Sequence, residues 1–166
     1  MFDNLSVFPM WQLLLLIVVA NGTPIILRDL LQQRLDTPVD FGRCFVDGYR
    51  WLGDSKTWRG IIGAPAVTAV AAWLMDLSLE AGIQVGLLAM LGDLIASFIK
   101  RRLRLPPSSM APLLDQIPEA LLPAIFLTDQ FGLDAVSIVI LLGLFIVFEL
   151  SISRVLYMLG IRKRPY

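Results

Sequence analysis

The chain has 166 residues, of which 57% are hydrophobic, and its mean hydropathy is +0.73. Soluble domains are about 45–50% apolar, so this composition excludes an ordinary soluble domain and predicts a membrane protein. Fourteen basic residues balance fourteen acidic ones, and the single cysteine, Cys44, excludes an internal disulfide. Histidine is absent, which excludes His-based acid/base chemistry, Ser-His triads and zinc–histidine sites. Any catalysis must use carboxylates, Lys or Arg, hydroxyls and a hard metal such as Mg²⁺.

Five apolar segments are predicted to span a membrane. The first covers about residues 8–31 and is expected to break at Asn21-Gly22-Thr23-Pro24. No basic residue precedes Arg28, so we expect this segment to be retained rather than cleaved as a signal peptide. The others cover about residues 60–79, 83–100, 111–128 and 135–159, and the fourth is the weakest because it carries three prolines and two carboxylates. We predict an all-α integral membrane protein in which residues 1–166 form one membrane domain.

The basic residues predict the orientation of these spans in the cell membrane. All fourteen Lys and Arg residues fall on one side of the five-span layout, in three groups at residues 28–59, 100–104 and 154–164. By the positive-inside rule, the N-terminus is outside and the C-terminus is cytoplasmic. Two cytoplasmic segments then remain, residues 32–59 and 101–117. We expect these segments and the inner halves of the helices to form a polar cytoplasmic cavity that holds the site.

An aspartate interrupts the third apolar segment. Asp93, Ser97 and Lys100 are spaced four and three residues apart, so they share one face of a helix. A lone carboxylate within a bilayer costs at least ~2.5 kcal/mol. We therefore expect a cation, either a metal or a basic side chain, to meet Asp93.

The first cytoplasmic segment contains a candidate phosphate-binding loop, Gly53-Asp54-Ser55-Lys56-Thr57, followed by Arg59. Its glycine permits close backbone approach, and its hydroxyls and cations suit phosphate oxygens. The spacing is not that of a Walker A loop, so a juxtamembrane basic segment attracted to anionic lipid headgroups is the alternative. The basic cluster at residues 100–104 is likewise open to a second interpretation, as a topology signal only.

Further carboxylates lie in the fourth and fifth segments. Asp115 and Glu119 share a helix face on the proline-rich fourth segment, and such broken helices line polar cavities. Asp93 with Asp115, or with Glu119, could supply the oxygen ligands that Mg²⁺ prefers. The alternative is that Asp115 only caps the fourth helix. For Glu149 in the fifth segment, pairing with a neighbouring helix is favoured over a catalytic role.

Several motifs resemble those of a known family. They are Asn21-x-x-Pro24, Pro38-Val39-Asp40-Phe41-Gly42-Arg43, Asp47-Gly48, Gly53-Asp54-x-Lys56-Thr57-Trp58-Arg59-Gly60, Gly92-Asp93-x-x-x-Ser97-Phe98-x-Lys100-Arg101-Arg102 and Pro112-x-Leu114-Asp115-Gln116. This set resembles the archaeal CDP-archaeol synthases, which are CTP:2,3-di-O-geranylgeranylglycerol-1-phosphate cytidylyltransferases, over nearly the whole chain. A more distant resemblance is to phosphatidate cytidylyltransferases, whose Ser-x-x-Lys-Arg element is matched by Ser97, Lys100 and Arg101. Their closing Asp-Arg-x-x-Asp element is matched only at Asp115.

The resemblance implies attack by a lipid phosphate on the α-phosphorus of CTP, with pyrophosphate leaving. It implies Asp93, Lys100 and Lys56 as catalytic residues and a Mg²⁺ ion on Asp93 and Asp115. For the CTP phosphates it implies a larger set: Gly53, Asp54, Ser55, Lys56, Thr57, Arg59, Ser97, Lys100 and Arg101. The expected partners are CTP, a lipid phosphate with geranylgeranyl ether chains and the bilayer, and no nucleic acid. A phosphomonoester has its second pKa near ~6, so the nucleophile needs no general base.

The alternative function is a small ion or proton-coupled transporter. In that interpretation, Asp93, Asp115, Glu119 and Glu149 form an ion path. The dense cytoplasmic loop argues against it, because a transporter needs polar access from both sides and the predicted outer loops are short.

Overall fold

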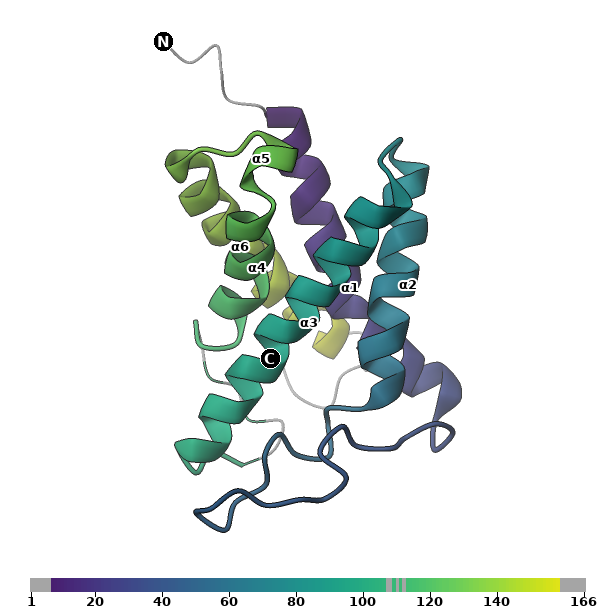
Figure 1. Cartoon of the computed structure of the whole chain (residues 1–166), viewed down its shortest axis with the longest axis vertical. Helices are drawn as coiled ribbons and strands as arrows, with labels where there is room; N and C mark the ends of the chain where they lie inside the picture. The colour runs from purple at the N-terminus through teal and green to yellow at the C-terminus, as the bar shows by residue number, and fades with distance from the viewer. Residues whose placement is uncertain (1–6, 107–108, 110, 112, 159–166) are drawn as a thin grey trace.

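The computed structural model describes residues 7–106, 109, 111 and 113–158. Within these residues the chain forms helices, with two isolated β-bridges in the loop between the first two. The helices are α1 (Val7–Leu31), α2 (Trp58–Leu74), α3 (Leu79–Arg102), α4 (Gln116–Phe126), α5 (Thr128–Phe131) and α6 (Ala135–Met158). Figure 1 shows an upright bundle with the α1–α2 loop at the lower end and α5 at the upper end. The prediction of an all-α protein is confirmed.

Three described helices are long and apolar enough to cross a membrane: Phe8–Leu31, Leu79–Arg102 and Ala135–Val155. Helix α2 is apolar but has 17 residues, so at 1.5 Å per residue it extends about 25 Å, short of a hydrocarbon core of about 30 Å. Helix α4 has 11 residues, about 16 Å, because it begins only after Asp115 and ends at Phe126. The membrane character is therefore confirmed for three segments, and the expected helical extents of 60–79 and 111–128 are too long.

Two predicted boundaries are wrong for identifiable reasons. Helix α1 does not break at Asn21–Pro24, because it continues through Pro24 to Leu31. The Thr23 hydroxyl donates to the Val19 carbonyl at 2.7 Å, and a proline is tolerated in an apolar helix where side chains and neighbours satisfy the freed groups. Helix α2 ends at Leu74 because the chain turns at Asp76, whose φ of +60° lies in the left-handed region.

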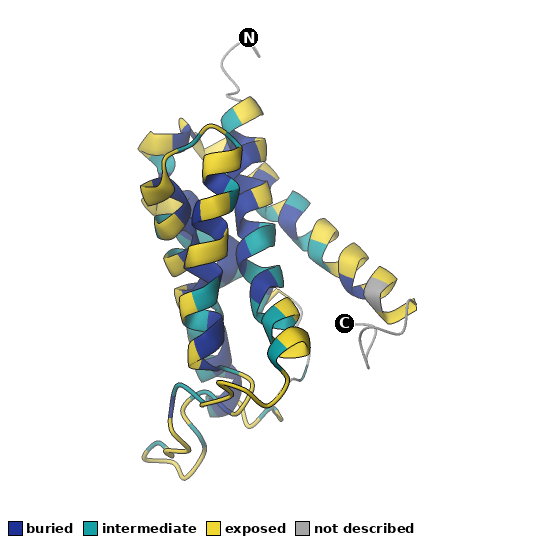
Figure 2. Cartoon of the chain, turned by 90° about the vertical axis from the view of Figure 1, so that its right-hand side faces the viewer, coloured by how far each residue is buried: buried dark blue, intermediate teal, exposed yellow. Residues whose placement is uncertain are grey.

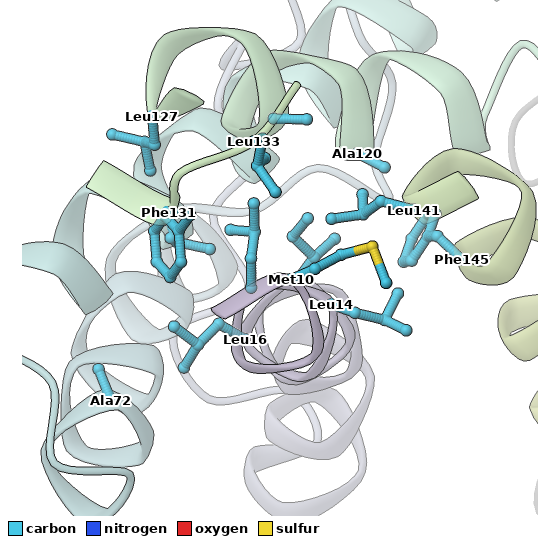
Figure 3. Close-up of a cluster of buried hydrophobic side chains, with 14 residues drawn as sticks. Met10, Leu14, Leu16, Ala72, Ala120, Leu127, Phe131, Leu133, Leu141 and Phe145 are labelled. Atoms are coloured by element: carbon cyan, nitrogen blue, oxygen red, sulfur yellow. The ribbon is translucent and has the colours of Figure 1, made fainter. Parts of the chain in front are cut away.

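The hydrophobic core lies mainly between α1, α4, α5 and α6, with small contributions from α2 and α3 (Figure 3). Helix α5 and the start of α1 are at the end of the bundle opposite the α1–α2 loop (Figure 1). The larger members of the core include Leu14 and Leu16 of α1, Phe131 of α5, and Leu141 and Phe145 of α6. In a bilayer, such packing stabilises through close contact rather than through removal of water. The polar residues lie in the other half of the bundle, between this apolar core and the α1–α2 loop.

Glycines set how closely α3 approaches its neighbours. A Cβ at Gly82 would lie 2.5 Å from the Ala69 Cα, and one at Gly86 would lie 2.6 Å from the Pro65 Cα. These two glycines, four residues apart, therefore let α3 pack directly on the α2 backbone. Nearer the α1–α2 loop, a Cβ at Gly92 would lie 2.3 Å from the Pro118 carbonyl oxygen. Gly92 thus brings the start of α4 against the helix face next to Asp93.

Helix α6 leaves the bundle along its second half (Figure 2). The side chains of Val147, Phe148, Ile152 and Val155 are exposed on that half. Together with Ser151 they line an apolar hollow of about 300 Å³. The four helices α1 to α4 therefore form the compact unit that positions the polar site, and α6 packs on it through its first half.

Candidate active site

Lys56 and Asp93 form the central ion pair of the site. Lys56 lies in the α1–α2 loop, two residues before α2 begins, and Asp93 lies in the middle of α3. The Lys56 Nζ donates to both carboxylate oxygens of Asp93 at 2.6 Å, and the two side chains are only 19% and 18% exposed. The expectation that a cation meets Asp93 is confirmed, and the cation in the structure is an ammonium.

The pKa of Lys56 is raised above its ordinary value by this setting. Burial acts to lower the pKa, since it disfavours the charged ammonium. The negative charge and hydrogen bond of Asp93 outweigh burial, with smaller contributions from Glu119 and Asp115. Lys56 therefore carries its positive charge throughout the neutral range and remains available to an incoming anion.

A second ion pair joins the end of α3 to the segment before α4. The Lys100 Nζ lies 2.6 Å from Asp115 Oδ1 and donates to the Ser109 carbonyl at 3.3 Å. The other Asp115 oxygen accepts from the Ala111 amide at 3.1 Å. Asp115 occupies the N-cap position of α4 but makes no side-chain capping bond to that helix, so capping is not its only role. Its charge instead faces the α3 lysine.

Glu119 completes what we call the lysine–carboxylate cluster, defined by Lys56, Asp93, Lys100, Asp115 and Glu119. Glu119 is 6% exposed, lies in the first turn of α4 and interacts with Asp93, Lys56 and Glu149. Its position follows from the close approach of α4 to Gly92. The cluster holds two ammonium groups and three carboxyl groups, and it lies between the apolar core and the long loop.

The long loop is folded around the carboxylate of Asp40. That carboxylate is 2% exposed and accepts from Arg50 at 2.6 and 3.1 Å. It also accepts from the amides of Gly42, Leu52 and Gly53 at 3.1, 3.1 and 2.9 Å. Burial acts to raise the pKa of Asp40, but the Arg50 guanidinium and the three amides hold it well below its usual range. Asp40 consequently stays ionised and organises the loop.

This loop structure fixes the position of Lys56. Gly53 has a φ of +101°, which favours glycine, and its amide donates to Asp40. The Val39 amide donates to the Lys56 carbonyl at 2.8 Å. Two residues after Lys56, the Trp58 amide donates to the Thr37 carbonyl at 3.1 Å. The glycine and the carboxylate of the loop therefore position the lysine through the backbone.

The other predicted phosphate ligands lie in different places. Arg59 is buried, donates to the Gln32 and Arg34 carbonyls at 2.7 and 2.9 Å, and pairs with Asp36 at 2.6 Å. Arg59 therefore binds the residues that follow α1 and does not face the lysine–carboxylate cluster. The remaining predicted ligands divide by exposure: Asp54 and Ser55 are exposed, whereas Gly53, Thr57 and Ser97 are buried.

Arg101 faces a separate hollow, which we call the arginine pocket. Its lining residues are Tyr49, Arg50, Arg101, Arg104, Leu105 and Pro106, and its volume is about 210 Å³. Arg101 donates to the Pro106 carbonyl at 3.0 Å, and the Arg104 guanidinium lies 5.5 Å from the centre of the Tyr49 ring. The pocket lies where the tip of the α1–α2 loop meets the end of α3.

Arg102 holds that loop tip in place, a role that was not predicted from the sequence. Its guanidinium lies 4.7 and 4.9 Å from the ring centres of Phe45 and Phe98 and pairs with Asp47 at 2.8 Å. It also donates to the Tyr49 and Arg50 carbonyls at 3.3 and 2.6 Å. The sequence gives one indication of this contact: the α1–α2 loop contains several aromatic and acidic residues, and the end of α3 is basic.

The carboxylates of the cluster could hold a magnesium ion only together with other ligands. Among the residues described, no group of three or more acidic or cysteine side chains could hold a metal alone. Mg²⁺ in nucleotide sites is bound by one or two carboxylates plus phosphate oxygens and water. Asp93 already holds a cation between its two oxygens, and Asp115 holds another at 2.6 Å. These hard oxygens are suitable donors once a triphosphate supplies the remainder.

Comparisons with known proteins identify the family and the fold of the chain. The family model of the CarS-like CDP-archaeol synthases matches residues 4–166. A solved structure described as an intramembrane enzyme for archaeal membrane lipids biosynthesis has a TM-score of 0.69 and 29% identity, covering 86% of this chain and 90% of that chain.

Curated relatives named CDP-archaeol synthase align over different lengths. The Thermofilum pendens protein is 34% identical, with 89% of this chain and 76% of the relative covered. For Sulfolobus acidocaldarius the identity is 31%, with 90% and 91% covered. The Pyrococcus furiosus protein is 43% identical, but the match spans 58% of this chain and 60% of the relative's length. The family resemblance predicted from the motifs is confirmed: the chain belongs to the CarS-like family of CDP-archaeol synthases.

Proposed function

We propose that this protein transfers CMP from CTP to the phosphate of an ether-linked isoprenoid glycerol phosphate, yielding a CDP-lipid and pyrophosphate. An oxygen of the lipid phosphate forms a bond to the α-phosphorus, the bond from that phosphorus to the bridging oxygen breaks, and the electron pair leaves with pyrophosphate. Family membership supports this reaction class. The observation that carries it is the joining of two lysine–carboxylate pairs, Lys56–Asp93 and Lys100–Asp115, beside the apolar core.

These pairs suit a reaction between two polyanions. Transfer of this kind is catalysed mainly by positioning and by neutralising charge. An arriving triphosphate offers oxygens that compete with Asp93 for Lys56 and with Asp115 for Lys100. The ammonium groups then turn to the phosphates, and the released carboxylates become available as ligands. Mg²⁺ bound by Asp93 and Asp115 would supply further charge neutralisation on the triphosphate oxygens.

Glu119 and Ser97 have supporting places in this proposal. Glu119 interacts with both Lys56 and Asp93. Its negative charge would therefore hold the Lys56 ammonium near the site when Asp93 exchanges Lys56 for a metal ion. Ser97 is buried on the α3 face shared by Asp93 and Lys100. Asp54 and Ser55 are exposed, and Arg59 pairs with Asp36. We therefore assign the phosphate contacts first to Lys56, Lys100 and Arg101.

The membrane arrangement belongs to the same proposal. Residues 1–166 form one membrane domain that crosses the cell membrane five times, with α2 and the α4–α5 pair as short spans. The N-terminus is outside and the active site opens to the cytoplasm, as the one-sided distribution of basic residues favours. The apolar hollow on the diverging half of α6 is a suitable surface for isoprenoid chains during entry from the bilayer. The transporter alternative has no support from the family match.

A direct transfer assay tests the function. The purified protein in detergent is incubated with labelled CTP, Mg²⁺ and digeranylgeranylglycerol phosphate, and cytidine label is measured in the lipid phase. We expect label that depends on both Mg²⁺ and the lipid phosphate. Ester-linked phosphatidic acid in a parallel reaction measures lipid selectivity. Folded protein that labels neither lipid would refute the proposed transferase.

A further inference from the structure

We propose that the α1–α2 loop, residues 32–57, is a membrane-docking element. Its exposed apolar side chains lie in the headgroup layer of the leaflet at the loop end of the bundle, and its partner is the anionic headgroup of a membrane lipid. This inference goes beyond the proposed reaction and rests only on the membrane arrangement given with it.

The loop exposes several large apolar side chains. They are Leu35, Phe41, Val46, Tyr49 and Trp51. Val46 is 93% exposed and lies in the turn of a short hairpin that the bridge between Cys44 and Arg50 closes. Single exposed apolar residues are common on proteins, but several in one short loop are typical of a surface that contacts a membrane or another protein.

The charge of the loop that is left without a partner is positive. Each of its four aspartates pairs with an arginine: Asp36 with Arg59, Asp40 and Asp54 with Arg50, and Asp47 with Arg102. Among the described residues, the exposed Arg34 and Arg43 of this loop form no ion pair. A guanidinium binds phosphate oxygens, and aromatic rings favour the headgroup level, so this combination suits an anionic lipid surface.

Helix α2 indicates the depth at which the loop begins. Its first and last turns carry the exposed Trp58 and Trp73, which mark the two membrane interfaces. The helix rises only about 22 Å between them, less than a hydrocarbon core of about 30 Å. The chain before Trp58 therefore starts at the membrane boundary rather than in bulk water. The ring centre of Phe41 lies 6.3 Å from that of Trp58, so this part of the loop is at the same level.

The other side of the loop is attached to the end of α3. The ring centre of Phe45 lies 5.0 Å from that of Trp51 and 5.5 Å from that of Phe98, which belongs to α3. Arg102, the last residue of α3, lies over the Phe45 ring. The loop thus contacts the ends of two membrane helices, and Figure 1 shows it running sideways beneath the bundle. A segment in this position can present its side chains to the headgroup layer.

Docking also bears on the site, because the loop carries Lys56. The loop backbone positions this lysine opposite Asp93. Contact between the loop and headgroups therefore keeps this part of the lysine–carboxylate cluster close to the leaflet. A partner protein could cover the same side chains, but the contact of Phe41 with Trp58 at the start of a membrane helix favours lipid.

Cys44 allows a direct test, because it is the single cysteine of the chain, is exposed and lies between Arg43 and Val46. An environment-sensitive fluorophore is attached to Cys44 of the full chain. The labelled protein is reconstituted into vesicles of diether phosphatidylcholine, with or without an equal part of anionic phosphatidylglycerol. Quenching by nitroxide groups on the lipid headgroups is compared with quenching by iodide in the water. We expect strong quenching by the lipid nitroxide and weaker quenching by iodide than for the free fluorophore.

Two variants test the chemistry of the contact. Arg43→Gln should lower the ratio of lipid quenching to iodide quenching about fivefold on anionic vesicles, the effect of one basic residue near such a surface, and leave it unchanged on phosphatidylcholine alone. Arg28→Gln is the matched control, because Arg28 is also exposed but pairs with Asp29. Val46→Ser should lower the ratio on both kinds of vesicle. Elution of each variant as a single species in detergent tests folding.

The outcomes separate docking from the transferase, because the quenching measurement needs no CTP. Iodide quenching as strong as that of the free fluorophore, without lipid quenching, would overturn the docking and leave a partner protein as the occupant. Equal ratios for Arg43→Gln and Arg28→Gln on anionic vesicles would overturn the assignment to anionic headgroups. A docked loop in a folded protein that transfers no CMP would support the docking while refuting the proposed reaction.

Discussion

The lysine–carboxylate cluster and the arginine pocket differ in how their positive charges are compensated. In the cluster, Lys56 and Lys100 are each within 2.6 Å of a carboxylate, and their side chains are 19% and 10% exposed. In the pocket, Arg101 and Arg104 have no carboxylate partner among the described residues. The cluster is internally neutralised, whereas neither pocket arginine forms an ion pair; of these two, Arg101 is buried and Arg104 is exposed.

The difference follows from the cost of charge in each environment. An unpaired ion is expensive inside a membrane bundle, so cations can be kept beside the apolar core only if carboxylates accompany them. In the proposed reaction, those carboxylates would be free to hold a metal once phosphate pairs with the lysines. Arg104, which follows the end of α3, can remain without a carboxylate partner because its side chain is exposed to water. In the proposed function, the cluster is the region suited to the chemical step.

Asp93→Asn should produce the largest effect, because it removes a proposed metal ligand and leaves the Lys56 ammonium without its main partner. We expect kcat to fall about 10³-fold, the order of loss when one preorganised electrostatic group is removed from an active site. Transfer of label to lipid is the measurement, with elution as a single species in detergent as the test of folding. Lys56→Ala is the companion variant and should mainly raise the CTP concentration required. Near-normal turnover of Asp93→Asn would remove the metal role.

Asp40→Asn should loosen the loop that positions both regions. Breaking a buried ion pair from one side costs about 3–5 kcal/mol. Hydrogen exchange at the amides of Gly42, Leu52 and Gly53, which donate to this carboxylate, reports the loss directly. Asp54→Asn is the control, since Asp54 pairs with the same arginine but is 76% exposed. Equal protection in both variants would contradict the organising role.

The pH dependence of that loop has a definite sign. The pKa of Asp40 is lower in the folded protein than in an unfolded chain. Its stabilising contribution is therefore present above the ordinary carboxyl pKa of about 3.9, and it is lost only as the pH falls through the lowered value. Amide protection in the wild type should stay constant from neutral pH down to about pH 5. The difference from Asp40→Asn should shrink only in stronger acid.

Gly92→Ala should separate α4 from α3 and thereby disturb the cluster without touching the pocket. The added Cβ would meet the Pro118 backbone at 2.3 Å, where little can yield. Overpacking of this kind costs about 1–3 kcal/mol, and the better helix propensity of alanine offsets roughly 1 kcal/mol of it. Gly143→Ala is the matched control, because nothing lies within 4 Å of its Cβ position. We expect Gly92→Ala alone to lower both the thermal midpoint and kcat.

Helical spacing predicted the site more reliably than hydropathy predicted the spans. The four- and three-residue steps from Asp93 to Ser97 and Lys100 do lie within one helix, α3, and the expected cation for Asp93 is present. Its identity could not be predicted, because Lys56 is 37 residues away and reaches Asp93 through a folded loop. Hydropathy windows overextended the second and fourth segments, since they do not register the turn at Asp76 or the late start of α4.

The loop was the least predictable part of the site. Its alternation of charges suggested phosphate contacts along its whole length, but Asp40, Arg50 and Arg59 are used to fold it. Some of these cations form structural contacts within the loop and cannot face a ligand. Those contacts join residues 10 to 27 positions apart, so a local sequence pattern does not predict them. The metal ligands Asp93 and Asp115 stay a prediction.

Salt should separate the two regions with the smallest effect of the series. Raising ionic strength from 0.1 M to 1 M shortens the Debye length from about 10 Å to about 3 Å, which screens exposed charges far more than buried pairs. We expect KM for CTP to rise several-fold, because salt screens the exposed basic residues that attract an anionic substrate, while kcat at saturating CTP changes less than about twofold. If kcat instead fell with salt while KM held constant, the exposed charges rather than the buried pairs would act in the transfer step itself.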